Sequence, residues 1–113
     1  MTKEDHFLRG MDCFAENRLA EAVAEFEAAL RLDPEDPDIL HAVAMTHYHL
    51  GNFAEALARG EQLRALDPRN PEAYTALSLF YNALGDVPRA EEMLAEAARL
   101  GITSPADEPI DFE

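Results

Sequence analysis

Three histidines lie close together in the chain, and they are the first residues to consider for metal or acid–base chemistry. They are His41, His47 and His49, with Met45 among them, and imidazole and thioether groups are both accepted by soft metal ions. In a helix, however, His41 and His49 would lie about 12 Å apart along the axis, too far to bind one ion together. His47 would point to another face, and we expect it to be a hydrogen-bonded core residue. The pattern therefore predicts no metal site within this chain, although a His/Met stripe completed by a partner's ligands stays an alternative.

No other side chains suggest catalysis or a cofactor. The chain has no Gly-rich phosphate loop and no convincing pair of nucleophile and base. Its single cysteine, Cys13, cannot form an internal disulfide and falls in an apolar column, so a buried thiol in a reducing cytoplasm is expected. The N-terminus lacks the basic-then-apolar order of a signal peptide, and no stretch approaches the roughly 18 apolar residues of a membrane span. We expect a cytoplasmic protein that is not an enzyme.

The charge narrows the class of partner. Lys and Arg total 9 against 23 Asp and Glu, which gives a formal charge of −14. Such a charge opposes binding to a phosphate backbone or to an anionic bilayer. Nucleic acids and membranes are therefore not expected as partners, and a protein partner is.

The elements that position these residues follow from an internal repeat of 34 residues. A period of this length indicates stacked units that share one core, because a single unit cannot bury its own apolar face. We predict one domain over residues 1–104 with units at 3–36, 37–70 and 71–104, followed by an acidic tail at 105–113. The columns that recur are Ala22, Ala56 and Ala90; Leu32, Leu66 and Leu100; and Pro37, Pro71 and Pro105.

Each unit is predicted to hold two helices. Residues 38–50 and 53–66 carry apolar residues at three-and-four spacing, and Gly51 between them supplies a left-handed turn. Asp86 is expected to cap the last helix with Pro88 in its first turn, and Thr2 with Asp5 is expected to form a capping box at the first. The fold class is therefore all-α.

These features together resemble the tetratricopeptide repeat family. They are the period of 34, the alanine that opens each second helix, the small residues Gly10, Ala44 and Ser78, the large residues Phe26 and Tyr81, and Asp-Pro at the end of two units. The resemblance covers about nine tenths of the chain. It implies a right-handed α-solenoid of three helix-turn-helix units, and a protein-binding adaptor or chaperone without catalytic activity.

The resemblance also implies a concave groove lined by the first helix of each unit. A separate stripe, such as Leu40, Val43, Ala44 and His47, is expected to pack the core, so a second apolar stripe predicts a surface for a partner's peptide or amphipathic helix. The alternative is that these side chains are ordinary core or are covered by the chain itself. The candidate groove residues are Phe7, Met11, Phe14, His41, Met45, Tyr48, His49, Leu79 and Asn82.

One function found in the family is disfavoured by the residues present. Members that hold the acidic C-terminus of heat-shock chaperones use a clamp of Lys, Asn and Arg side chains on the groove. None of the matching positions here is basic or an amide, and a glutamate there would repel a carboxylate. The matching positions are Phe7, Met11, Ala42, Glu72 and Ala76.

Gly60 departs from the pattern, because its column holds large residues in the other units. We expect Tyr74 or Tyr81 to fill the space, with a small pocket or a soft joint as the alternative. Glycine inside a helix also costs about 1 kcal/mol of helix propensity.

The C-terminal end bears on assembly. No capping helix follows the last unit, so Leu94, Ala98 and Ile102 are expected to need a cover, and a homo-oligomer would supply it. The tail is either disordered or a docking motif carried by Ile110 and Phe112. Three alternatives to a monomeric adaptor stay open: a chaperone similar to those of type III secretion translocators, an oligomeric assembly element, and a metal-binding protein.

Overall fold

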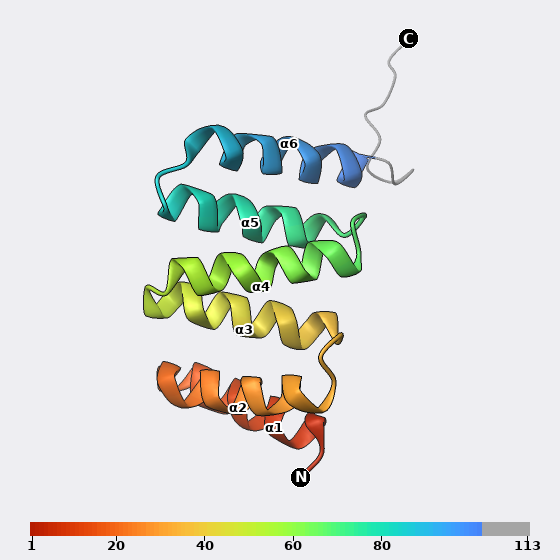
Figure 1. The fold of residues 1–113 in the computed structure, drawn as a ribbon. Helices are drawn as coiled ribbons and strands as arrows, with labels where there is room; N and C mark the ends of the chain where they lie inside the picture. The colour runs from red at the N-terminus through yellow and green to blue at the C-terminus, as the bar shows by residue number, and fades with distance from the viewer. Residues whose placement is uncertain (103–113) are drawn as a thin grey trace.

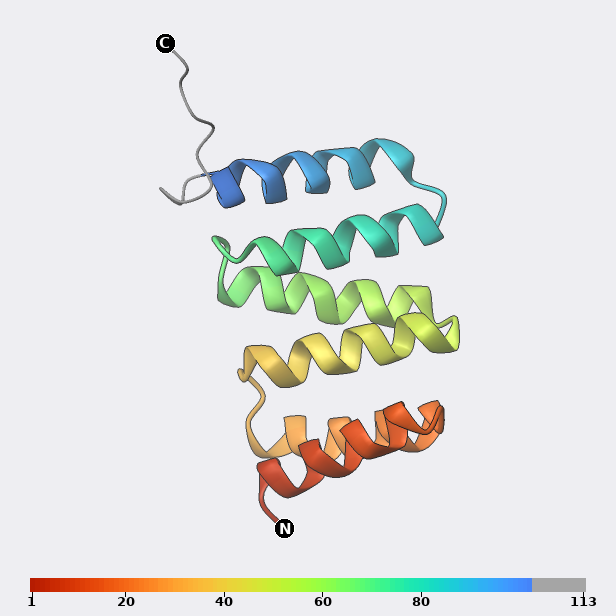
Figure 2. The same cartoon turned by 180° about the vertical axis from the view of Figure 1, so that it is seen from behind.

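The computed structural model describes residues 1–102, and every regular element in that range is a helix (Figure 1). The fold is an all-α helical repeat solenoid, as the sequence predicts. The helices stack in chain order, and the same succession is seen from behind (Figure 2). They are α1 (Lys3–Ala15), α2 (Leu19–Leu32), α3 (Pro37–Leu50), α4 (Phe53–Leu66), α5 (Pro71–Ala83) and α6 (Val87–Ile102).

Contacts between helices are mostly sequential. Each helix packs on the one before and the one after it, and α3 also touches α5, the first helix of the following pair. The predicted unit bounds of 3–36, 37–70 and 71–104 stay a prediction, and the last two residues of the third unit lie outside the described range.

Polar side chains fix where several helices begin. Thr2 Oγ1 accepts the N–H of Asp5 at 3.2 Å while Asp5 Oδ2 accepts the N–H of Thr2 at 3.0 Å, which is the predicted capping box. Asp36 and Asn70 cap α3 and α5, each followed by a proline at the first helical position. Asp86 Oδ1 accepts the N–H of Arg89 at 3.3 Å, so the predicted cap of α6 is confirmed. The left-handed turn at Gly51 is confirmed as well, with φ of 85°.

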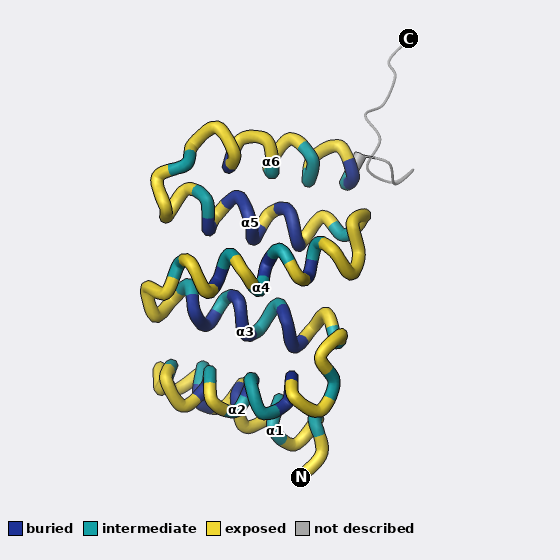
Figure 3. Tube along the Cα trace, viewed as in Figure 1, coloured by how far each residue is buried: buried dark blue, intermediate teal, exposed yellow. Residues whose placement is uncertain are grey.

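The core consists of two clusters, one between the first and second pairs of helices and one between the second and third. Phe26 and Leu40 are central to the first, and Leu77 and Phe80 to the second. Buried and exposed segments alternate along each helix because one face packs on its neighbours (Figure 3). The packing stripe predicted for α3 and the predicted burial of Cys13 are both confirmed.

The space beside Gly60 is filled, but not by the tyrosines that the sequence suggested. A Cβ atom at Gly60 would lie 2.8 Å from Leu77 Cδ2 and 3.2 Å from the Phe80 ring. The expectation of Tyr74 or Tyr81 is therefore wrong. The Tyr81 hydroxyl instead donates a hydrogen bond to the Glu61 carboxylate at 3.0 Å.

Candidate functional site

Three adjoining hollows follow α1, α3 and α5, with volumes of about 340, 490 and 370 Å³. The first and second share Phe7 and Asp38, and the second and third share His41, Met45 and Glu72. The hollows therefore form one continuous surface, called the groove below. Its lining includes Glu4, Phe7, Met11, Phe14, Asp38, His41, Met45, Glu72, Leu79 and Asn82.

Most of the candidate groove residues line these hollows. Five of them, from Phe7 to Met45, line the second hollow, while Leu79 and Asn82 line the third. Tyr48 and His49 line none of the three. The Tyr48 ring lies 5.6 Å from Phe53 and 5.7 Å from Phe80, and His49 is exposed with its ring 5.4 Å from Phe14.

The groove and the core share aromatic side chains at the N-terminal end. Phe7 is half-buried with its ring 5.5 Å from the core residue Phe26, and Phe14 also packs against the first core cluster. The exposed apolar surface of the groove comes instead from Met11, which is 48% exposed, and Leu79, which is 36% exposed. Truncating Met11 or Leu79 would therefore alter the groove with less damage to the core than truncating Phe14.

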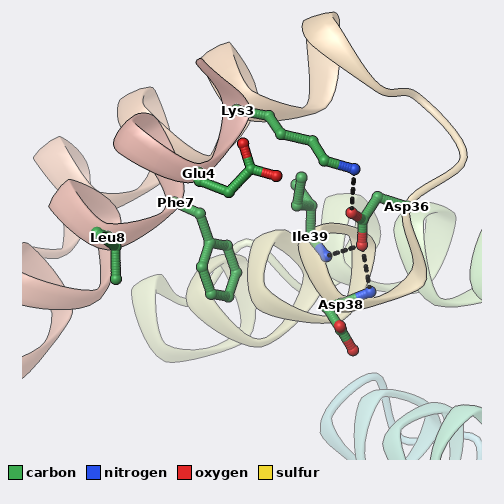
Figure 4. Close-up of a pocket in the computed structure, with 7 residues that line it drawn as sticks. All are labelled: Lys3, Glu4, Phe7, Leu8, Asp36, Asp38 and Ile39. Carbon is green, nitrogen blue, oxygen red and sulfur yellow. Dashed lines mark hydrogen bonds and ion pairs between the residues drawn. The ribbon is translucent and has the colours of Figure 1, made fainter. Parts of the chain in front are cut away.

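An ion-pair cluster lies at the N-terminal end of the groove, where Lys3 and Asp36 line the first hollow (Figure 4). Lys3 extends from α1 and donates to Asp33 at 2.5 Å and to Asp36 at 2.9 Å. These hydrogen bonds raise the pKa of the Lys3 ammonium far above its ordinary value. The cluster joins the start of α1 to the start of α3, and Phe7 and Ile39 line the same hollow.

Asp36 has two tasks in this cluster, because it also caps α3. Burial alone would raise the pKa of its carboxyl group. The hydrogen bonds from Lys3 and from the N–H groups of Ile39 and Asp38 outweigh burial and hold the pKa below its ordinary value of 3.8. Asp36 therefore carries its negative charge at neutral pH. It pairs with Lys3, the one cationic side chain that lines the first hollow.

Three further carboxylates line the groove without any such partner. Glu4, Asp38 and Glu72 occupy the same position in successive repeats, 34 residues apart, in the first turns of α1, α3 and α5. Within residues 1–102 none of their carboxylates has an ion pair or a hydrogen bond. From the sequence, Glu72 was considered as a groove carboxylate but the set of three was not recognised. The 34-residue register identifies this set, which we call the acidic row.

A parallel set of apolar residues follows the same register. Met11, Met45 and Leu79 are also 34 residues apart on α1, α3 and α5, and each lines the second or third hollow. We call this set the methionine row. Each of its members lies seven residues after a member of the acidic row, so both rows run across the same three helices.

The histidines are dispersed, as helix geometry predicts. His47 is buried at 8% exposure, with Nδ1 3.3 Å from Asn52 Nδ2 and Nε2 3.6 Å from the Glu27 carboxylate. The expectation of a hydrogen-bonded core histidine is confirmed. His41 lies in the groove and His49 outside it. In the described part of the chain, no group of three or more His, Cys, Asp or Glu side chains is placed to hold a metal ion.

The C-terminal end of the solenoid exposes apolar side chains. Leu94 on α6 is 48% exposed and Ala98 is exposed as well. The side chain of Ile102 lies outside the described residues, as do the tail and its candidate docking residues Ile110 and Phe112. No helix among residues 1–102 is both long and apolar enough to cross a bilayer.

Two overlapping family matches together cover residues 10–101. A family described as "TPR repeat" matches residues 10–51, and one described as "Tetratricopeptide repeat" matches residues 48–101. The chain belongs to the tetratricopeptide repeat family. No curated protein sequence matches it significantly.

Solved structures of low sequence identity share the fold. The first TPR domain of Spaghetti (RPAP3) bound to the HSP90 peptide SRMEEVD is 21% identical over 98% of this chain and 82% of that one, with a TM-score of 0.84. PcrH in complex with the chaperone binding region of PopB is 23% identical over 94% and 86%, with a TM-score of 0.86. The Yersinia enterocolitica type III secretion translocator chaperone SycD is 18% identical over 92% and 79%, with a TM-score of 0.85.

Proposed function

We propose that this protein is a non-enzymatic adaptor or chaperone that binds a segment of a partner protein in its groove. The observation that carries this proposal is the methionine row, which places Met11, Met45 and Leu79 along three helices beside connected hollows. Met45 is half-buried and also packs against the second core cluster, while Met11 and Leu79 are exposed. Exposed apolar side chains gathered in a hollow favour binding of another protein, and methionine adapts to partner shape.

The family and its structures support this class of function. Tetratricopeptide proteins are in general interaction modules, and RPAP3 and PcrH are each described with a bound segment of another protein. Two features separate the present groove from one that holds an acidic peptide. No cation occupies the clamp positions, and Glu72 lines the second and third hollows. Among the related structures, the groove chemistry thus favours the translocator-chaperone kind of partner over an acidic C-terminus.

A capture experiment from the native host tests the proposal. The double variant Met11→Ser with Leu79→Ser should abolish capture of a partner that the unchanged protein retains, because both apolar anchors of the groove are lost. Leu94→Ser is the matched control, since Leu94 and Met11 are both 48% exposed but lie on opposite ends of the solenoid.

The outcomes separate the alternatives. Loss of capture in the groove variant alone supports binding of the partner in the groove, provided that circular dichroism shows unchanged helix content. Loss of capture in Leu94→Ser alone, together with a smaller assembly in light scattering, would instead support an oligomer built on α6. A partner retained equally by all three proteins contradicts the proposed function.

A further inference from the structure

We propose that the occupant of the groove is a basic amphipathic helix, whose Lys or Arg side chains face the acidic row and whose apolar side chains face the methionine row. This inference rests on the proposed function and specifies the chemistry of the partner. It is carried by the separation of the two rows, by the spacing along them and by charges that the described part of the chain leaves uncompensated.

The separation of the rows matches the width of one helix. On each of α1, α3 and α5, the carboxylate and the apolar residue are seven residues apart, as Asp38 and Met45 are on α3. Seven residues make about two turns, so the two side chains lie on nearly the same face and about 10 Å apart along the helix axis. An α-helix with its side chains is about 10–12 Å wide. One helix laid across the solenoid can therefore touch both rows at once.

The spacing along the rows also favours a helix over an extended segment. α3 and α5 are in contact, and the axes of packed helices lie about 8–10 Å apart. A bound helix advances about 10 Å in seven residues and returns to the same face. A strand covers that distance in about three residues, an odd number that turns the side chain to the opposite face. A heptad repeat of Lys and Leu therefore stays in step with both rows, whereas the side chains of a strand at this spacing alternate between opposite faces.

The unpaired negative charges of the groove indicate that the partner is positively charged. The acidic row has no ion pair within residues 1–102, and the cation lining the first hollow, Lys3, is held by Asp33 and Asp36. A basic helix would supply the missing positive charges. The chain's own tail would not, because residues 105–113 contain four acidic residues and no basic one. Repulsion by the acidic row makes the tail a poor occupant of this groove.

A synthetic helical peptide provides the probe. It carries Lys at every seventh position along one edge and Leu along the adjoining stripe, and its affinity for the full chain is measured by fluorescence anisotropy at physiological salt. The Lys peptide should bind, and a peptide with Glu in place of Lys should bind at least tenfold more weakly. A scrambled peptide of the same composition should also bind weakly, because its stripes are broken.

Two triple variants with the same change in net charge separate the acidic row from general attraction by a negative protein. Glu4→Gln, Asp38→Asn and Glu72→Gln remove the row. Exposed carboxylates on α4 and α6 outside the groove provide the control, which is Glu55→Gln, Glu91→Gln and Glu92→Gln. Removing the row should weaken the Lys peptide about tenfold, the effect of three modest surface ion pairs, while the control should change affinity less than twofold. Melting curves verify that both variants are folded.

The failures of the two proposals are distinguishable. If the Lys and Glu peptides bind alike while Met11→Ser with Leu79→Ser abolishes binding, the groove is real and the basic partner is wrong. Equal weakening by the two triple variants, or no binding of the Lys peptide, also overturns the basic helix. If the peptide binds and the Met11 and Leu79 changes have no effect, both proposals fail.

Discussion

Replacing Phe80 with alanine should lower the free energy of unfolding by about 3–5 kcal/mol, the usual cost of truncating a fully buried aromatic residue. Phe80 is 0% exposed and belongs to the second core cluster. The cavity left behind would adjoin Gly60, which has no side chain to move into it. Chemical denaturation monitored by circular dichroism measures the loss.

The neighbouring residue on α5 provides the comparison. Leu79 lies in the groove, so Leu79→Ala should change the free energy of unfolding by no more than about 1 kcal/mol. Similar losses for Phe80→Ala and Leu79→Ala would show that the division of α5 into a core face and a groove face is incorrect.

The second large effect is expected from the smallest substitution, Gly10→Ala. A Cβ atom at Gly10 would lie 2.5 Å from Cδ1 and Cε1 of Phe26, and this ring is fully buried with the ring of Phe7 packed against it. The rigid ring cannot yield without repacking the first core cluster. Gly10→Ala should therefore lower the free energy of unfolding by about 1–3 kcal/mol, although alanine is the better helix former by about 1 kcal/mol.

Gly101→Ala is the control for this substitution. Apart from its own helix backbone and chain neighbours, no atom of residues 1–102 lies within 4 Å of the Cβ position at Gly101. Gly101 is also helical, so alanine there should leave stability unchanged or raise it slightly. If Gly10→Ala stabilised the protein to the same extent as Gly101→Ala, the close contact between α1 and α2 at Phe26 would be contradicted.

Local structure was predictable because it depends on residues close in sequence. The 34-residue period located the helix pairs, and the caps at Thr2 and Asp86 follow from one polar side chain near a few backbone N–H groups. The turn at Gly51 needs a positive φ that glycine adopts without strain. None of these features requires knowledge of how one unit rotates against the next.

Contacts between units were harder to predict, as Gly60 shows. The residues that fill the space beside it lie on α5, and their identity depends on how α5 is rotated about its axis when it packs on α4. Tyr74 and Tyr81 were expected to fill the space, but Leu77 and Phe80 point at Gly60. The repeat period alone does not predict the rotation of α5 about its axis.

The groove was predictable in position and less so in detail. The 34-residue register places Met11, Met45 and Leu79 on successive helices, and the structure gathers them beside connected hollows. Phe7 and Phe14 were assigned to a partner surface, yet each also packs against the core. The acidic row was overlooked as a set because carboxylates in the first turn of a helix are already explained by the helix dipole. Only the structure shows that they line the same groove.

The most direct test of the groove uses the four methionines as probes. With ¹³C-labelled methionine methyl groups, the full chain is titrated with the Lys peptide and followed by NMR. Met11 and Met45 line the groove, whereas Met1 and Met93 line none of its three hollows. Met45 and Met93 both pack against the second core cluster, so they differ only in their position relative to the groove. The account predicts that the methyl signals of Met11 and Met45 shift with one common binding curve while those of Met1 and Met93 stay in place. Shifts confined to Met93 or Met1, or no shift at millimolar peptide, would contradict it.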